Sequence, residues 1–193
     1  MKVVAITGSS RPAGNTNYLV DQALDEIASK GFETEKICLS QHRVNPCLGH
    51  EDCATYKVCT QNDDARWILE KLYNADGIIL SSPVYYYNVS AQMKALIDRN
   101  YFYYNRKIRM KASCVGLIAI CGGDGTEHTI RVFNRYLKLS ADIPDNMVVS
   151  LAGRANKQLD TVGSNQALTD EARSLGRRIA EMLTEQGAVN EQL

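Results

Sequence analysis

The sequence predicts an α/β protein with a doubly wound parallel sheet of five strands, in the order 2-1-3-4-5, between two layers of helices. Three observations lead to this prediction. Short apolar runs alternate with helical apolar stripes along the whole chain. The runs lack the alternation of apolar and polar residues that a half-exposed sheet shows, so we expect both faces to be covered. Five alternating strand and helix units then favour this strand order in an αβα arrangement of three layers.

Each element is predicted in turn from its local pattern. The strand-length apolar runs bounded by turn residues lie at 3–7, 34–39, 77–80, 114–120 and 147–151. Apolar stripes at helical spacing follow them at Leu19, Ala23 and Ile27; at Ala65, Leu69 and Leu72; at Met93, Leu96 and Ile97; at Ile130, Phe133 and Leu137; and at Leu175, Ile179 and Met182. With no internal repeat and no Pro/Ser-rich linker, residues 1–193 are expected to form a single domain.

Composition and charge exclude several classes of protein. The 193 residues are 45% hydrophobic, which suits one globular domain with its own core. The 22 basic and 22 acidic side chains cancel, so there is no field to attract nucleic acid or anionic lipid. No apolar run reaches the roughly 20 residues of a membrane span, and the start does not resemble a signal peptide. We therefore expect a cytoplasmic protein with neither nucleic acid nor membrane as partner.

The four loops that follow the first four strands are the expected place for a ligand. They cover residues 8–15, 40–62, 81–90 and 121–126. In an open α/β sheet, ligands bind beyond the carboxyl ends of the strands, at the point where the strand order reverses. The chemistry of these loops therefore indicates what the protein binds.

The first loop has the composition of a phosphate site. It supplies hydroxyls, Arg11 and backbone amides at the start of a helix. Alternatively, its small residues only form the turn, and Asn15 or Thr16 caps the helix. The loop lacks the lysine of an NTPase loop, and Ser10 stands where a dinucleotide fingerprint has its second glycine. A phosphate monoester, such as the tail of a mononucleotide, is the favoured ligand.

The third loop and the helix after it carry a family resemblance. Residues 82–99 read Ser-Pro-Val-Tyr-Tyr-Tyr-Asn-Val-Ser-Ala-Gln-Met-Lys-Ala-Leu-Ile-Asp-Arg. With the G-S-S-R-x-x-G-N-T stretch of the first loop, this resembles the S-P-x-Y-x-x-x-x-S-x-x-x-K-x-x-I-D-R signature of the flavodoxin-like NADPH-dependent FMN reductases and their close relatives, the iron-sulfur flavoproteins. The resemblance covers nearly the whole chain. It implies a flavodoxin-like fold, bound FMN and hydride transfer from NAD(P)H to a quinone, a free flavin, a metal ion or a protein.

The resemblance also implies which residues contact the FMN. The contacts are Ser9, Arg11, Asn15, Thr16 and Asn17 at the phosphate, Pro83, Val84, Tyr85 and Tyr86 at the ring, and Gly122 and Gly123 beside it. Which of Tyr85, Tyr86 and Tyr87 stacks on the flavin stays open, and an aromatic run packed in an interface is the alternative. Ser90 is either part of this site or a plain N-cap. Because a flavin performs the hydride chemistry itself, no catalytic side chain is expected.

The second loop places four candidate metal ligands close together in the sequence. They are Cys47, His50, Cys53 and Cys59, spaced as C-x-x-H-x-x-C-x5-C. The segment is similar to the P-C-x-x-C-x-x-C-x4-7-C segment of iron-sulfur flavoproteins, except that His50 replaces the second cysteine. A [4Fe-4S] cluster with one imidazole ligand, a zinc ion and a loop that has lost its cluster all stay open. Because the loop follows the second strand, we expect a cluster there to lie near the flavin.

A bound cluster would change the expected function. Together, a flavin and a cluster would make the protein a one-electron carrier between partner proteins, which is the main alternative to an NAD(P)H-dependent reductase. A mononucleotide-binding or regulatory protein without redox activity is a third class, because the fold does not fix the function.

Cys38 and Cys114 lie in or beside strands, and we expect both side chains to pack in the core.

A basic and aromatic segment at 99–111 indicates a contact surface. Four aromatic residues, 101–104, precede four basic ones, with no acidic residue among them. Such segments can bind nucleic acid, but the net charge of zero argues against this. Exposed aromatic side chains in number mark interfaces, so we expect a homo-oligomer. Binding of a pyridine-nucleotide phosphate by Arg106, Lys107 or Arg109 is the alternative.

Overall fold

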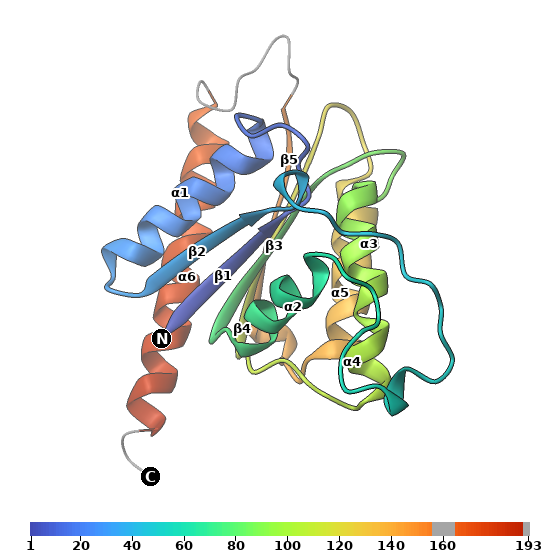
Figure 1. Ribbon diagram of the computed structural model, residues 1–193. Coiled ribbons are helices and arrows are strands. Elements are labelled where there is room, and N and C mark those ends of the chain that lie inside the picture. The colour runs from blue at the N-terminus through green and yellow to red at the C-terminus, as the bar shows by residue number, and fades with distance from the viewer. Residues whose placement is uncertain (156–164, 191–193) are drawn as a thin grey trace.

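The computed structural model describes residues 1–155 and 165–190 and contains a five-stranded parallel sheet (Figure 1). The strand order is β2-β1-β3-β4-β5. The strands are β1 (Lys2–Thr7), β2 (Glu33–Cys38), β3 (Gly77–Pro83), β4 (Cys114–Cys121) and β5 (Val148–Arg154). The predicted fold class and strand order are confirmed.

Helices cover both faces of the sheet and enclose two apolar cores (Figure 1). The helices are α1 (Asn15–Ser29), α2 (Ala65–Asn74), α3 (Ala91–Arg99), α4 (Tyr101–Asn105), α5 (Thr126–Ser140) and α6 (Gln166–Asn190), with 3-10 turns η1 (Leu39–Gln41), η2 (Cys53–Thr55) and η3 (Asp145–Met147). Residues of α1 and α6 pack in one core, and residues of α2, α3 and α5 in the other. None of the described helices is long and apolar enough to cross a membrane.

Two strands extend further at their carboxyl ends than the apolar runs predict. β3 continues past Leu80 to Pro83, and its last residue pairs with Ile120 of β4. β5 continues past Leu151 to Arg154, whereas Met147 belongs to η3. The added residues are small or polar and give no apolar signal, but pairing with β4 still holds them in the sheet. These extensions bring the ends of both strands up to the ligand edge.

The strand order reverses beside β1, and the first and third loops meet there. The amide of Gly8 donates to the carbonyl of Ser81 at 2.8 Å. A Cβ atom at Gly8 would lie 2.6 Å from Oγ of Ser90 and 2.9 Å from Cβ of Met93. Gly8 therefore permits a close approach between the end of β1 and the start of α3.

Candidate functional site

A cavity of 430 Å³ lies at the carboxyl ends of β1, β3 and β4, where the sequence predicts the ligand. The first, third and fourth loops all contribute to its wall. The lining residues are Ser9, Arg11, Ala13, Gly14, Asn15, Thr16, Pro83, Val84, Tyr85, Ile120, Cys121, Gly122 and Ala155. The volume lies within the range of small-molecule sites, about 300 to 1,000 Å³.

One end of the cavity is suited to an anion. Helix α1 begins there, and its N-cap residue is Gly14, so Asn15 and Thr16 do not cap the helix as the alternative interpretation supposed. Both line the cavity instead, beside the exposed Arg11. The positive end of the helix dipole and a guanidinium thus face the same space, an arrangement that favours a phosphate.

Asn17 supports this end of the cavity from below rather than lining it. The residue is buried, and its Nδ2 donates to the carbonyl of Arg11 at 2.7 Å. Its Oδ1 accepts from the thiol of Cys38 at 3.8 Å. Burial raises the pKa of the Cys38 thiol, consistent with its expected role in packing. The amide of Asn17 therefore fixes the backbone that presents Arg11.

The other end of the cavity is formed by the third loop. Tyr85 and Asn88 exchange two backbone hydrogen bonds of 3.0 Å around a tight turn. The two residues between them, Tyr86 and Tyr87, have φ angles of 49° and 62°, which non-glycine residues adopt at a cost. Tyr86 is fully exposed and lies outside the lining, and Tyr87 packs edge-on against His128. Among the three tyrosines, Tyr85 is the one that reaches the cavity.

Ser90 connects the third loop to α3. Its Oγ accepts from the amide of Met93 at 3.3 Å, so Ser90 is the N-cap that the simpler interpretation proposed. Its own amide donates to Oγ of Ser82 at 2.8 Å. These two bonds hold both ends of the third loop and thereby fix where Tyr85 lies.

The fourth loop contains three glycines that occupy different environments. Gly122 lines the cavity, whereas Gly123 does not, and a Cβ atom at either would meet nothing within 4 Å. Gly125 has φ of 101°, and a Cβ atom there would lie 2.9 Å from Cδ1 of Tyr87. Only glycine adopts this conformation readily, so Gly125 lets the fourth loop pack on the third. Cys121 and Ala155 were missed because both lie at strand ends that the apolar pattern does not mark.

The loop with the candidate metal ligands, residues 42–64 and hereafter the cysteine loop, does not stay at this edge. It passes along α3 and reaches α4 (Figure 1). There η2 contacts α4, and Arg106 donates to the carbonyls of Ala54 and Tyr56. Cys59 lies beside Arg99, at the opposite end of α3 from Ser90, roughly 14 Å away along the helix. The expectation that this loop lies near the cavity of its own chain is therefore wrong, because a loop of this length is free to leave the edge.

The four predicted ligands are not arranged as a metal site, although three of them are thiols close enough to affect one another. Burial raises the pKa of Cys53, and the neighbouring thiols of Cys47 and Cys59 raise it further. Nδ1 of His50 lies 3.5 Å from Oγ1 of Thr60. Within residues 1–155 and 165–190, no three His, Cys, Asp or Glu side chains are arranged to hold a metal ion. In this conformation the cysteine loop does not fit an iron-sulfur cluster.

Arg99 and Asp63 form a buried ion pair beside Cys59. Their side chains are 2% and 0% exposed. Arg99 also donates from Nη1 to the carbonyl of Asn45 and from Nη2 to Sγ of Cys59, each at 3.2 Å. Burial alone would lower the pKa of Arg99, but the hydrogen bonds to Asp63 and Cys59 outweigh burial and raise it. Sequence reasoning gave neither residue this role, because an ion pair across 36 positions leaves no local pattern.

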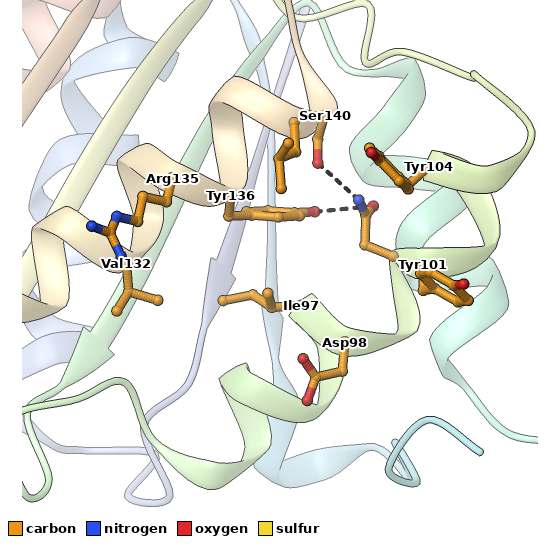
Figure 2. A pocket seen from close by; sticks show the side chains of 10 residues that line it. Ile97, Asp98, Tyr101, Tyr104, Val132, Arg135, Tyr136 and Ser140 are labelled. Atoms are coloured by element: carbon orange, nitrogen blue, oxygen red, sulfur yellow. Dashed lines mark hydrogen bonds between the residues drawn. The ribbon is translucent and has the colours of Figure 1, made fainter. Parts of the chain in front are cut away.

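The basic and aromatic segment forms α4 and one wall of a second cavity, a groove of 480 Å³ between α3, α4 and α5 (Figure 2). Tyr101 and Tyr104 are exposed beside it, whereas Phe102 is buried. Figure 2 shows the Tyr136 hydroxyl donating to the Asn100 side chain, which in turn donates to Ser140. These bonds satisfy the polar groups beneath the groove.

Two of the three basic residues suggested for a nucleotide phosphate are engaged within the chain. Arg106 bonds the carbonyls of η2 and lies over the ring of Phe102. Arg109 pairs with Asp142 and donates to the carbonyls of Leu139 and Ala141. The structure gives these two guanidinium groups a role in joining segments.

Comparison with known proteins gives consistent matches. Residues 1–154 match the family described as NADPH-dependent FMN reductase. An iron-sulfur flavoprotein of Methanocaldococcus jannaschii is 37% identical over 188 residues, which cover 95% of this chain and 97% of that protein. An NAD(P)H:quinone oxidoreductase from Methanothermobacter marburgensis has a TM-score of 0.73 at 15% identity, over 93% of this chain and 96% of that one. A flavodoxin from the domain Archaea has a TM-score of 0.60 at 16% identity, over 95% and 99%. At such identities the two structures show a shared fold.

Proposed function

This chain belongs to the NADPH-dependent FMN reductase family, and from that premise we propose that it binds FMN in the 430 Å³ cavity and uses NAD(P)H to reduce a quinone, a free flavin, a metal ion or a protein acceptor. The observation that carries the proposal is the two-ended cavity. One end offers Arg11 and the start of α1, and the other offers Pro83, Val84 and Tyr85. Bound flavin supplies the redox chemistry, and the protein positions it and controls access.

The residues of the chain have separate tasks in this proposal. Arg11, Ser9 and the first residues of α1 bind the phosphate. Pro83, Val84 and the turn at Tyr85 hold the ring at the strand ends. No side chain is assigned a catalytic proton transfer, since hydride transfer between a nicotinamide and a flavin requires none.

The proposal is tested by comparing FMN with riboflavin, which has the same ring and no phosphate. Titration of the flavin-free chain, followed by flavin fluorescence, should show much tighter binding of FMN. Arg11→Ala should weaken FMN binding and leave riboflavin unchanged, whereas Arg131→Ala, at an exposed arginine of α5, should change neither. Equal affinity for both ligands would contradict the assignment of the phosphate end. NADH and NADPH oxidation with a quinone then measures the activity.

A second candidate function is that of an iron-sulfur flavoprotein that carries single electrons between proteins. It is favoured by the named relative in M. jannaschii and by the three thiols of the cysteine loop. Iron and acid-labile sulfide in anaerobically purified protein test it directly. Zinc in the same sample would support the alternative of a zinc site, and the absence of both metals would leave the reductase.

For the predicted homo-oligomer we propose the groove of Figure 2 as the contact surface, occupied by a second copy of this chain. Tyr104 and Leu139 beside it are more than half exposed. Asp98 and Arg135, of opposite charge, also line it. In a two-fold arrangement each Asp98 can face the second copy's Arg135, so the surface is complementary to itself.

A further inference from the structure

We propose that Arg99 is a positioning residue that holds the cysteine loop in its observed place without a metal ion, by joining the two ends of the loop and by fixing the sulfur of Cys59. The proposal concerns the loop alone and does not depend on flavin binding. It accounts for the disagreement between a metal-like spacing in the sequence and side chains that do not gather as ligands.

The first support is the connection between the ends of the loop. Asn45 precedes the first cysteine, and Asp63 follows the last. Oδ2 of Asp63 accepts from the amide of Asn45 at 2.8 Å, and Nη1 of Arg99 contacts both this oxygen and the carbonyl of Asn45. Asn45 and Asp63, which are 18 positions apart in the sequence, are thereby both bound to one guanidinium group.

Neighbouring residues reinforce the same closure. The amide of Arg43 donates to Oδ2 of Asp64 at 2.7 Å, and the amide of Asp64 donates to the carbonyl of Arg43 at 2.9 Å. The first residues of the loop are therefore paired with its last residues, directly before the start of α2. Because Arg99 belongs to α3, it fastens this closed base to a packed helix.

The second support is the contact with Cys59. A guanidinium has five N–H donors and no acceptor, so a buried one requires several acceptors around it. The carboxylate of Asp63, the carbonyl of Asn45 and the sulfur of Cys59 supply them. Cys59 thus completes the surroundings of Arg99, and Arg99 in turn fixes where this sulfur lies.

The third support is that the middle of the loop has its own anchor. Arg106 donates to the carbonyls of Ala54 and Tyr56, on either side of the end of η2. A loop organised by metal acquires its structure when the metal binds. Here protein groups hold the base, the middle and Cys59, so the order of the loop should survive a chelator.

Hydrogen exchange on the full chain as purified, treated with a chelator, tests the proposal. In the wild type we expect slow exchange at the hydrogen-bonded amides of Arg43, Asn45 and Asp64, which peptides covering 42–48 and 56–64 report. Arg99→Gln should speed exchange at least about tenfold in both, while a peptide from α1 stays unchanged. If Arg99 joins the two ends of the loop, protection from exchange should be lost in both segments together, although they are distant in sequence. Lys94→Gln, at an exposed position of the same helix, is the matched control and should alter neither segment.

Two further variants separate positioning from general destabilisation, because Arg99→Gln leaves the carboxylate of Asp63 buried and unpaired. The double variant Arg99→Gln with Asp63→Asn removes both charges, and we expect it to fold and still exchange fast at 56–64. Arg99→Lys keeps the positive charge but replaces the planar guanidinium, with its several donors, by one ammonium group. In this variant we expect slower hydrogen exchange at 42–48 than at 56–64.

Two results would overturn the proposal. One is a chelated wild-type loop that exchanges as fast as an unfolded chain and becomes slow only when iron or zinc is added. The other is unchanged protection of both segments in the double variant. Neither result depends on whether flavin is bound. Failure of the proposal for Arg99 is therefore distinguishable from failure of the FMN assignment.

Discussion

The loops of the cavity and the cysteine loop start from the same edge of the sheet but are held by different means. The cavity loops are short and fixed by neighbouring strands, as when Gly8 bonds Ser81 and Val84 bonds Ile120. The cysteine loop is long and leaves the edge, and one buried ion pair between Arg99 and Asp63 closes it. The position of a short loop is determined by the strands that it connects to, whereas the position of a long loop depends on a few tertiary contacts.

Neutralising one member of the ion pair should have the largest effect on the cysteine loop. Asp63→Asn leaves the Arg99 guanidinium buried without its counter-charge, and such a loss costs about 3 kcal/mol or more. Urea unfolding of the variant should show this decrease in the free energy of unfolding. The double variant with Arg99→Gln should recover a large part of it. A single variant within about 0.5 kcal/mol of the wild type would mean that the pair contributes little.

A matched pair of glycine variants in the fourth loop sharpens the comparison from the cavity side. Gly125→Ala forces a side chain into a φ of 101° and against Tyr87, which should displace the third loop. We expect FMN affinity to fall about 10-fold to 100-fold, since strain and overpacking each cost about 1 kcal/mol or more. Gly123→Ala, which lies outside the cavity lining and in open space, should change affinity by less than about threefold. Isothermal titration with FMN measures both, and equal effects would show that the packing at Gly125 does not shape the site.

The two regions also differ in what the sequence alone predicts. Ser9, Arg11 and Tyr85 were predicted as FMN contacts, and all three line the cavity, because each lies in a short loop after a strand whose place in the sheet is predictable. Tyr86 was predicted with them, but its side chain is fully exposed in a turn where both Tyr86 and Tyr87 have left-handed backbone conformations. A run of aromatic residues gives no signal for such a turn. The position of the cysteine loop was predicted wrongly.

The physical reason for that failure is the range of the interactions. Helical stripes and strand runs are set by neighbours within a few residues, so β4 and α5 were found from their own patterns. The contact of Arg99 with Cys59 spans 40 positions and depends on the packed fold. A ligand-like spacing fixes which donors are available, and only the tertiary contacts decide whether they meet.

Charge reversal on the groove of Figure 2 tests whether a third region links copies of the chain. Asp98→Arg and Arg135→Asp should each weaken self-association about tenfold or more, because each places like charges together twice in a two-fold dimer. The double variant restores opposite charges and should restore association. Sedimentation velocity measures all three, with charge reversal at Glu181 on α6 as the control. A wild-type chain that stays monomeric at tens of micromolar would contradict the interface.

The smallest expected effect concerns the pH dependence of the base of the cysteine loop. The backbone amide of Arg43 and the indole of Trp67 hold the pKa of Asp64 below its usual value of 3.8. A lowered pKa means that the ionised carboxylate stabilises the folded chain above pH 3.8, and that this stabilisation is lost as the pH falls through the folded-state pKa. The difference in urea midpoint between the wild type and Asp64→Asn should therefore be constant at neutral pH and shrink in acid. Asp25→Asn, at an exposed residue of α1, controls for the loss of one negative charge. A difference that stays constant down to pH 3 would place the effect of Asp64 in the neutral hydrogen bond, and the closure of the loop would then rest on Arg99 and Asp63 without help from this charge.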